Sequence, residues 1–150
     1  MPIQIRGASH RDVDQVVELL GAQYIEHAIV LSPATLQEAV RILISDPGRG
    51  AILVANDSNV SKVVGIAVLA YAWGLEYGGR IAWLDELFVD SNQRDRGVGR
   101  ALLQRALVVA KEAGCRTAQL EVAAGHERAE HLYRREGFRP VPRRRWSCPL

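Results

Sequence analysis

The sequence predicts a single α/β domain built on a mixed, mostly antiparallel sheet. Its 150 residues suit one domain with its own hydrophobic core, without disulfides or metals. Short apolar runs of strand length alternate with segments of helical spacing, and no repeat or linker interrupts them. With 48% hydrophobic and 24% charged residues and no apolar run long enough to span a bilayer, the composition excludes disorder and membrane insertion. No secretory signal precedes the first strand, so we expect a cytoplasmic protein.

The first third of the chain predicts one strand followed by two helices. Residues 3–6 alternate weakly and predict a strand. A Ser-x-x-Asp pattern at Ser9 begins a helix that we expect to end near Gly21. Serine followed by proline at Ser32 begins a second helix, which stops before Asp46.

The middle of the chain predicts the core of the sheet and its longest helix. Residues 51–55, 63–73 and 81–89 are apolar runs separated by turns, which favours an antiparallel meander. From Gly99 an apolar stripe at helical spacing continues until Gly114, a natural helix stop.

The last third predicts a strand, a helix and a terminal pair of strands. Residues 117–122 have strand character, and Glu127–Glu136 form an amphipathic helix ended by Gly137. Residues 138–148 predict one or two further strands. The expected sheet therefore has six to seven strands and about four helices.

Charge is unevenly placed along the chain. Residues 1–90 hold 6 basic and 11 acidic residues, a net charge of −5, whereas residues 91–150 hold 13 basic and 6 acidic residues, a net charge of +7. The second part could face an anion and the first could attract a cation. The alternative is that these charges only solvate helix faces.

Residues 87–103 form a strand, a polar loop and a glycine-bearing helix start. The first N–H groups of a helix lack intrahelical partners and lie at its positive end, so this order can bind an anion such as phosphate. Arg94, Arg96 and Arg100 add positive charge. A dinucleotide-binding G-x-G-x-x-G motif is excluded because Leu102 stands at its third glycine, and no P-loop motif occurs. An ordinary tight helix entry remains the alternative.

Two blocks of sequence resemble the GCN5-related N-acetyltransferase (GNAT) superfamily. The first is similar to its acetyl-CoA motif, [RQ]-x-x-G-x-[GA] after a strand, and reads Arg94-x-x-Gly97-x-Gly99. The second comprises Leu120-x-Val122, Ala129-x-x-Leu132-Tyr133 and Glu136-Gly137-Phe138. The resemblance implies a GNAT-like sheet in which the fourth and fifth strands splay apart to admit the thioester.

The resemblance also implies how acetyl-CoA would bind. The backbone of Phe88 and Val89 would pair with the pantetheine arm, and the turn from Arg94 to Arg100 would hold the pyrophosphate. Asp95 stands where glycine is common and His126 where asparagine is usual. The implied cofactor-binding residues are Leu87, Phe88, Val89, Arg94, Asp95, Arg96, Gly97, Val98, Gly99, Arg100 and His126.

Three residues are candidates for the chemistry. The resemblance assigns Tyr133 as the acid that protonates the leaving thiolate; the alternative is an ordinary packed aromatic. Asp85 and Glu86 are adjacent acids in an apolar strand, which is costly unless they are paired or line a cleft. By similarity to polyamine acetyltransferases, we expect Asp85 to be the base and Glu86 to contact the substrate. A salt bridge to a nearby arginine would explain either acid equally well.

The predicted acceptor is a primary amine of a small cationic molecule. Trp73, Tyr77 and Trp83 could form an aromatic wall over it or merely cover the core. A protein amine as acceptor, or a non-catalytic acyl-CoA-binding regulator, are the alternatives. Histidine and cysteine spacing predicts no metal site. The basic run Arg143–Arg145 is typical of a solvated edge, so no nucleic-acid or membrane partner is expected, and the family resemblance allows a homodimer.

Overall fold

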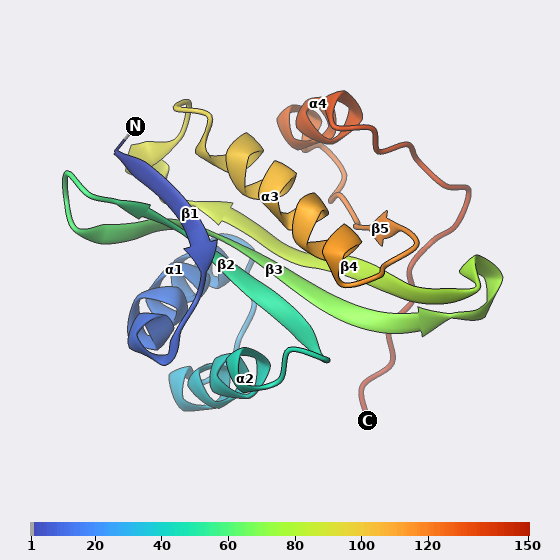
Figure 1. Ribbon diagram of the computed structural model, residues 1–150, viewed down its shortest axis with the longest axis horizontal. Helices are drawn as coiled ribbons and strands as arrows, with labels where there is room; N and C mark the ends of the chain where they lie inside the picture. Colours follow the sequence, from blue (N-terminus) through green and yellow to red (C-terminus); the bar gives the residue numbers. More distant parts are fainter. Residues whose placement is uncertain (1) are drawn as a thin grey trace. The chain divides into compact units, whose positions relative to one another are not determined.

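The structure of the protein is a computed structural model that describes residues 2–150 (Figure 1). The chain divides into two compact units, residues 1–120 and residues 121–150, and each is described by itself. The first unit contains β1 (Ile3–Gly7), α1 (Val13–Glu26), α2 (Pro33–Ser45), β2 (Gly50–Asp57), β3 (Lys62–Gly74), β4 (Gly79–Val89), α3 (Val98–Glu112) and β5 (Ala118–Gln119). The second unit contains α4 (Glu127–Arg135).

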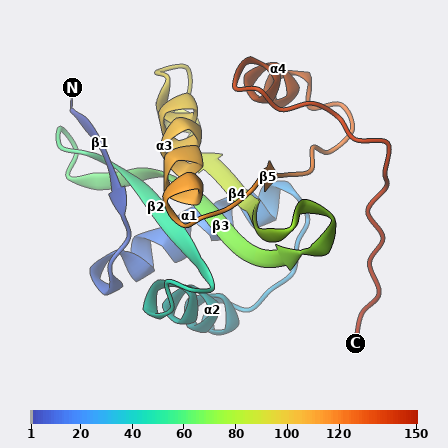
Figure 2. The ribbon, with the colours of Figure 1, turned by 45° about the vertical axis from the view of Figure 1, so that its right-hand side comes forward.

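The first unit has three layers around one sheet. The strands lie in the order β1-β2-β3-β4-β5, and every neighbouring pair is antiparallel except β4 and β5, which are parallel. Figures 1 and 2 show α1 and α2 on one face of the sheet and α3 on the other. The sequence prediction of a mixed, mostly antiparallel sheet with four helices is confirmed.

Both faces of the sheet are packed with apolar side chains. The face under α1 and α2 buries side chains of both helices and of the sheet, including Val16, Leu20, Val40, Val54 and Ile66. The other face lies under the apolar stripe of α3, whose Leu102 and Leu103 are fully buried. At Gly65 an added Cβ would lie 2.9 Å from Cδ1 of Leu102, so α3 approaches β3 closely there.

The two helices before the meander begin where their capping patterns predict. The Ser32 hydroxyl accepts a hydrogen bond from the Thr35 N–H at 3.2 Å, which starts α2. A capping box at Ser9 precedes α1. The prediction that this helix ends near Gly21 is wrong, because α1 continues to Glu26. Its buried face extends past the glycine, and such packing offsets the ~1 kcal/mol that a glycine costs inside a helix.

The prediction of six to seven strands is also wrong, since residues 2–150 contain five. The strand expected over residues 117–122 is reduced to Ala118–Gln119, and residues 138–148 form none. Pro140 and Pro142 interrupt that last segment, and proline has no N–H to donate to a neighbouring strand. β5 pairs only with Ala82 and Trp83 of β4, so within the described residues the rest of that edge of β4 has no paired strand.

Candidate active site

β4 contains a β-bulge at the predicted acidic pair. Val68 of β3 pairs with Glu86, whereas Leu69 pairs with Leu84, so Asp85 is the extra residue that the register between the two strands skips. An extra residue shifts the alternation of side chains between the two faces. Beyond the bulge, Glu86 therefore shares the face of Val68 under α1 and α2, while Asp85 is exposed.

Glu86 is half-buried beneath α1. The Tyr24 hydroxyl donates a hydrogen bond of 2.9 Å to Oε1 of Glu86. Burial raises the pKa of Glu86 and is the largest influence on it; the charge of Asp85 also raises the pKa, while hydrogen bonds from Tyr24 and Gln23 oppose the rise. Glu86 is therefore a better proton acceptor than an exposed glutamate would be.

Two residues near the end of α1 surround the Glu86 carboxylate. Burial and the negative charge of Glu86 raise the pKa of Tyr24, so its hydroxyl remains a donor at all ordinary pH values. Gln23 is only 8% exposed, and its side-chain oxygen Oε1 has no hydrogen-bond partner within residues 2–150. A buried amide oxygen and a carboxylate are both acceptors, so together they suit a ligand that donates hydrogen bonds.

The backbone of β4 beyond the bulge has an outward-facing edge. The Asp90 N–H donates to the Val64 C=O at 2.8 Å, which makes these two residues a hydrogen-bonded pair with β3. Such pairs alternate along an antiparallel ladder. The backbone groups of Phe88 therefore face β3, and those of Leu87 and Val89 face away from it. This corrects the expectation that the backbone of Phe88 is open to a pantetheine arm.

The predicted phosphate turn links β4 to α3 and contains two left-handed residues. Gly97 is the N-cap of α3 with φ +76°, and Asp95 has φ +67°. Glycine adopts this conformation freely, and aspartate tolerates it better than most residues. The turn leads directly into the first N–H groups of α3, which lack partners within the helix. The turn thus leaves the start of α3 in the local arrangement that can accept an anion, while its role as a phosphate site stays a prediction.

The arginines of this turn are held by carboxylates. Arg96 donates to Asp57 at 3.2 Å and also to Gln93, and the Asp57 side chain is almost fully buried. Arg94 donates to the Val89 C=O at 3.0 Å and approaches Glu26 of α1 at 3.6 Å. These contacts fix both guanidinium groups at the rim of the turn while neutralising part of their charge.

The three aromatic residues predicted as a wall lie on different faces. Trp73 pairs with Arg80, and Trp83 pairs with Ala70, so their side chains alternate to opposite sides of the β3–β4 ladder. Tyr77 lies near the hairpin, where an added Cβ on Gly74 would be 3.3 Å from its ring. The structure therefore does not bring these side chains together as one surface.

The second unit contains the two remaining candidates. Tyr133 on α4 is half-buried, and its ring meets Phe138 edge-to-face with centroids 5.8 Å apart. Burial raises the pKa of Tyr133, so its hydroxyl is protonated near neutral pH. His126 is the N-cap of α4 but its side chain makes no capping hydrogen bond.

Residues 2–150 hold neither a cluster of metal-ligating side chains nor a helix suited to span a membrane. No three His, Cys, Asp or Glu side chains gather there as metal ligands. In the same residues, no helix combines the length and apolar character needed to cross a membrane.

Comparison with known families identifies the fold. The family model of the acetyltransferase (GNAT) family matches residues 13–138, which is most of the chain. The chain belongs to the GNAT family. This confirms the resemblance drawn from the two sequence blocks. The matched residues include β4 and the turn before α3.

Individual similar proteins match only part of this chain or share modest identity with it. An uncharacterized N-acetyltransferase of Methanocaldococcus jannaschii is 40% identical over 58 residues, which are 39% of this chain and only 26% of that protein. An integron cassette protein from the mobile metagenome of Cole Harbour Salt Marsh is 28% identical, with a TM-score of 0.86 over 98% of this chain and 90% of its own. A predicted acetyltransferase from Clostridium acetobutylicum, solved with acetyl-CoA, has the same fold (TM-score 0.80, 16% identity, 97% and 96% coverage).

Sequence reasoning missed Gln23 and Tyr24. Both follow Gly21, where the helix was expected to end, and Tyr24 is separated from Glu86 by 62 residues. The available signal was the spacing of Tyr24, which lies four residues after the buried Leu20 and so extends the same apolar stripe.

Proposed function

We propose that this GNAT protein is an acetyl-CoA-dependent N-acetyltransferase acting on a primary amine of a small cationic molecule. The observation that carries the proposal is the half-buried Glu86 carboxylate, which Tyr24 holds next to the Gln23 side-chain oxygen, an acceptor that no group of residues 2–150 satisfies. The carboxylate and the amide oxygen are acceptors that a protonated amine would satisfy, and Glu86 lies directly before the open edge of β4.

The residues present fit acetyl-CoA. The outward-facing backbone groups of Leu87 and the N–H of Val89 can pair with the amides of the pantetheine arm, whereas the Val89 C=O already accepts from Arg94. The turn before α3 offers helix N–H groups and the positive charges of Arg94, Arg96 and Arg100 to the pyrophosphate. When bound, acetyl-CoA supplies a thioester whose carbonyl carbon accepts the lone pair of the amine and whose thiolate departs.

Glu86 is assigned the role of base. An alkyl amine has a pKa of about 10.4 in water, so it must lose a proton before it can attack near neutral pH. Glu86 is half-buried and has a raised pKa, whereas Asp85 is exposed, so these positions favour Glu86 over Asp85 for proton removal. We therefore exchange the two roles expected from the sequence, and Asp85 becomes a contact for a second positive charge on the acceptor.

Tyr133 is assigned the role of acid at the leaving thiolate, as the family resemblance implies. Its protonated hydroxyl has the chemistry that this role needs. The retention of this tyrosine speaks against a non-catalytic regulator.

A protein amine is the second candidate acceptor, and one observation favours it. The connection between α1 and α2 exposes Ile29, Val30 and Leu31, the middle one almost completely. Such an apolar segment could contact side chains of a peptide that follow its acetylated amine.

An acceptor panel tests these assignments. Purified protein and acetyl-CoA are incubated with a polyamine, an aminoglycoside, an alkyl monoamine and a peptide with a free α-amine, and the acetylated products are measured by mass spectrometry. We expect kcat/KM for the polycationic amines to exceed that of the monoamine by about tenfold or more, as expected for a charge-assisted contact. Preference for the peptide would replace the small-molecule proposal, and absence of any product would reject acetyl transfer to these amines.

Two glutamate variants separate the chemistry from general charge effects. Glu86→Gln keeps the side-chain volume but removes the proposed base, and we expect kcat to fall about 10²-fold or more. Glu38→Gln removes one exposed negative charge from α2 and should leave kcat unchanged. Equal rates in Glu86→Gln and the wild-type protein would remove Glu86 from the mechanism.

A further inference from the structure

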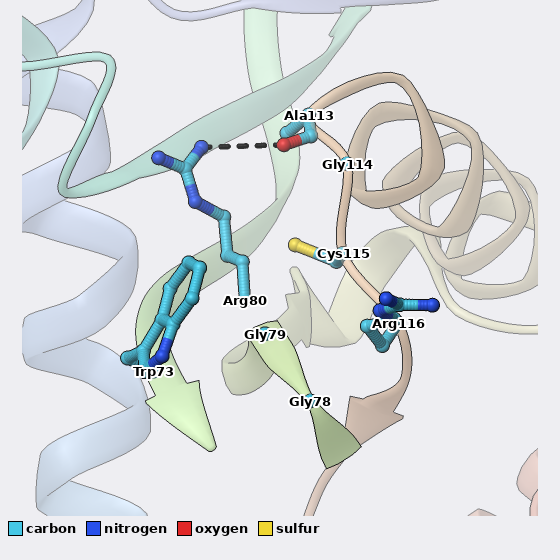
Figure 3. Close-up of a pocket in the computed structure, with 8 residues that line it drawn as sticks. All are labelled: Trp73, Gly78, Gly79, Arg80, Ala113, Gly114, Cys115 and Arg116. Carbon is cyan, nitrogen blue, oxygen red and sulfur yellow. Dashed lines mark hydrogen bonds between the residues drawn. The ribbon is translucent and has the colours of Figure 1, made fainter. Parts of the chain in front are cut away.

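A hollow lies at the far end of α3 from the phosphate turn. Its volume is about 620 Å³, within the range of small-molecule sites. The residues that line it are Trp73, Gly78, Gly79, Arg80, Ala113, Gly114, Cys115 and Arg116 (Figure 3). The 15 residues of α3 correspond to ~22 Å, so the hollow is separate from the proposed acetyl-CoA turn.

The charged side chains that line this hollow are both arginines. Nη1 of Arg80 donates to the Ala113 C=O at 3.2 Å, and its guanidinium lies 5.3 Å from the centroid of the Tyr71 ring. These contacts hold Arg80 in one orientation, so little side-chain entropy is lost when it binds a ligand. Arg116 is exposed, and its guanidinium forms no ion pair with the residues described. No acidic residue of the lining neutralises either charge.

Trp73 adds a flat aromatic surface to the same hollow. It is the cross-strand partner of Arg80, yet 71% of its surface is exposed. Figure 3 shows Trp73 and Arg80 on one side of the hollow and Arg116 on the other, with Cys115 between them. An exposed indole beside fixed positive charge is a surface on which planar rings stack.

Glycine keeps the floor of the hollow open. A Cβ added to Gly79 would lie 3.5 Å from Nε of Arg116 and 3.9 Å from Cη2 of Trp73. A larger side chain at Gly79 would therefore occupy the space between the arginine and the indole.

From these contacts we infer that the hollow binds a small planar aromatic anion. Its ring stacks on Trp73, and its carboxylate or phosphate oxygens accept hydrogen bonds from Arg80 and Arg116. The two guanidinium groups supply paired donors of the kind that recognise planar anionic groups. This site is independent of the proposed acetyl transfer.

Binding is tested with probes that vary one property at a time. 1-Naphthoate and 1-naphthyl phosphate carry a ring and a negative charge, 1-naphthalenemethanol has the ring without the charge, and cyclohexanecarboxylate has the charge without the aromatic ring. Titration calorimetry should detect both aromatic anions, with the two incomplete probes at least about tenfold weaker. The tighter of the two anions identifies the oxygen group that the site prefers. Equal binding of the neutral alcohol would overturn the inference.

Cys115 reports where the probe binds. Because Cys148 is the other free thiol, the measurement uses the Cys148→Ser protein, in which N-ethylmaleimide labels Cys115 alone. Saturating aromatic anion should slow labelling of Cys115 by about fivefold or more if it occupies the hollow, since the thiol lines the same space. Calorimetric binding with unchanged labelling would place the probe elsewhere and overturn the inference.

Exposed positions allow variants that keep the fold. Arg116→Gln and Trp73→Leu each remove one proposed contact and should weaken probe binding roughly three- to tenfold. Arg105→Gln removes the same charge from the exposed face of α3 outside the hollow and should not change binding beyond a small salt-sensitive effect. Equal losses in Arg116→Gln and Arg105→Gln would show general electrostatic attraction and reject the site.

Discussion

Replacing Tyr24 with phenylalanine tests the most specific contact in the candidate active site. The substitution keeps the ring on α1 and removes only the hydroxyl that donates to Glu86 at 2.9 Å. That hydrogen bond favours the charged carboxylate, whereas burial and the charge of Asp85 disfavour it. Without the hydroxyl, the pKa of Glu86 should rise further.

The size of the expected rise in the pKa of Glu86 follows from the energy of the lost hydrogen bond and from the burial of the carboxylate. A hydrogen bond to a charged group contributes roughly 1.5–3 kcal/mol when it is lost without replacement. Glu86 is only half-buried, so water can replace part of the contact. We therefore expect the loss of the hydroxyl to disfavour the charged carboxylate by about 1.4 kcal/mol, just below that range. Since 1.36 kcal/mol corresponds to one pKa unit, we expect a rise of about one unit.

The assay is the pH dependence of kcat/KM, which reports the base of the free enzyme. If Glu86 is the base, the acidic limb in Tyr24→Phe should move upward by about one pH unit, while the rate on the plateau changes little. Tyr71→Phe removes a hydroxyl on the α3 face of the sheet and serves as the matched control, with an unshifted limb. A Tyr24→Phe profile that overlays the wild-type profile would refute the coupling between Tyr24 and the base.

Tyr24→Phe should also change how the free energy of unfolding depends on pH. Because the pKa of Glu86 is raised in the folded protein, its contribution to stability is fully present below the ordinary pKa of a glutamate and is lost as the pH rises through the folded value. Tyr24→Phe enlarges that loss. Its decrease in the free energy of unfolding should therefore be greater at pH 7 than at pH 4, by about 1 kcal/mol. An equal decrease at both pH values would mean that Tyr24 contributes only packing.

Three further predictions concern other parts of the chain. Gly97→Val places a branched side chain at φ +76° and should cost about 1–3 kcal/mol of stability together with a large loss of acetyl-CoA affinity by calorimetry, and unchanged affinity would reduce the turn to a helix entry. Tyr133→Phe should lower kcat about 10²- to 10⁴-fold with little change in acetyl-CoA affinity, and wild-type turnover would return the residue to a packing role. Asp12, whose pKa the Arg6 hydrogen bond lowers to about 2, contributes stability above its ordinary pKa of 3.8 that is lost as the pH falls toward 2. Asp12→Asn should flatten that part of the stability curve in acid denaturation, whereas an unchanged slope would assign it to other carboxyl groups.

Local patterns predicted most of the fold because they act over a few residues. Each of the successful predictions depends on residues within one or two helical turns of one another. These are the Ser32 cap of α2, the apolar stripe of α3 and the N-cap glycine at position 97. The missed strands depended on longer-range pairing. Residues 138–148 contain aromatic and apolar residues of strand character, yet the prolines at 140 and 142 remove N–H donors that a ladder needs.

The candidate site was predictable only in part for the same reason. The turn before α3 and the acidic pair at positions 85 and 86 are visible as residue types in a local pattern. The bulge is not, because it depends on the register between β3 and β4, and it decides which acid is buried. The contact between Tyr24 and Glu86 brings together residues 62 positions apart, which no local spacing specifies.

The bulge at Asp85 connects the chemistry to acetyl-CoA binding. If Asp85 paired with Val68 in a regular ladder, Glu86 would alternate to the face of α3, away from Tyr24 and Gln23. The same shift decides which backbone groups of β4 face outward beyond it, namely those of Leu87 and Val89. The register that skips Asp85 thus sets both the face on which the proposed base lies and the edge along which a pantetheine arm could pair. Asp85→Asn keeps the bulge, so it should retain acetyl-CoA affinity and base function and weaken only the preference for a second positive charge on the acceptor. A loss of kcat for a monoamine as large as that in Glu86→Gln would instead make Asp85 the base.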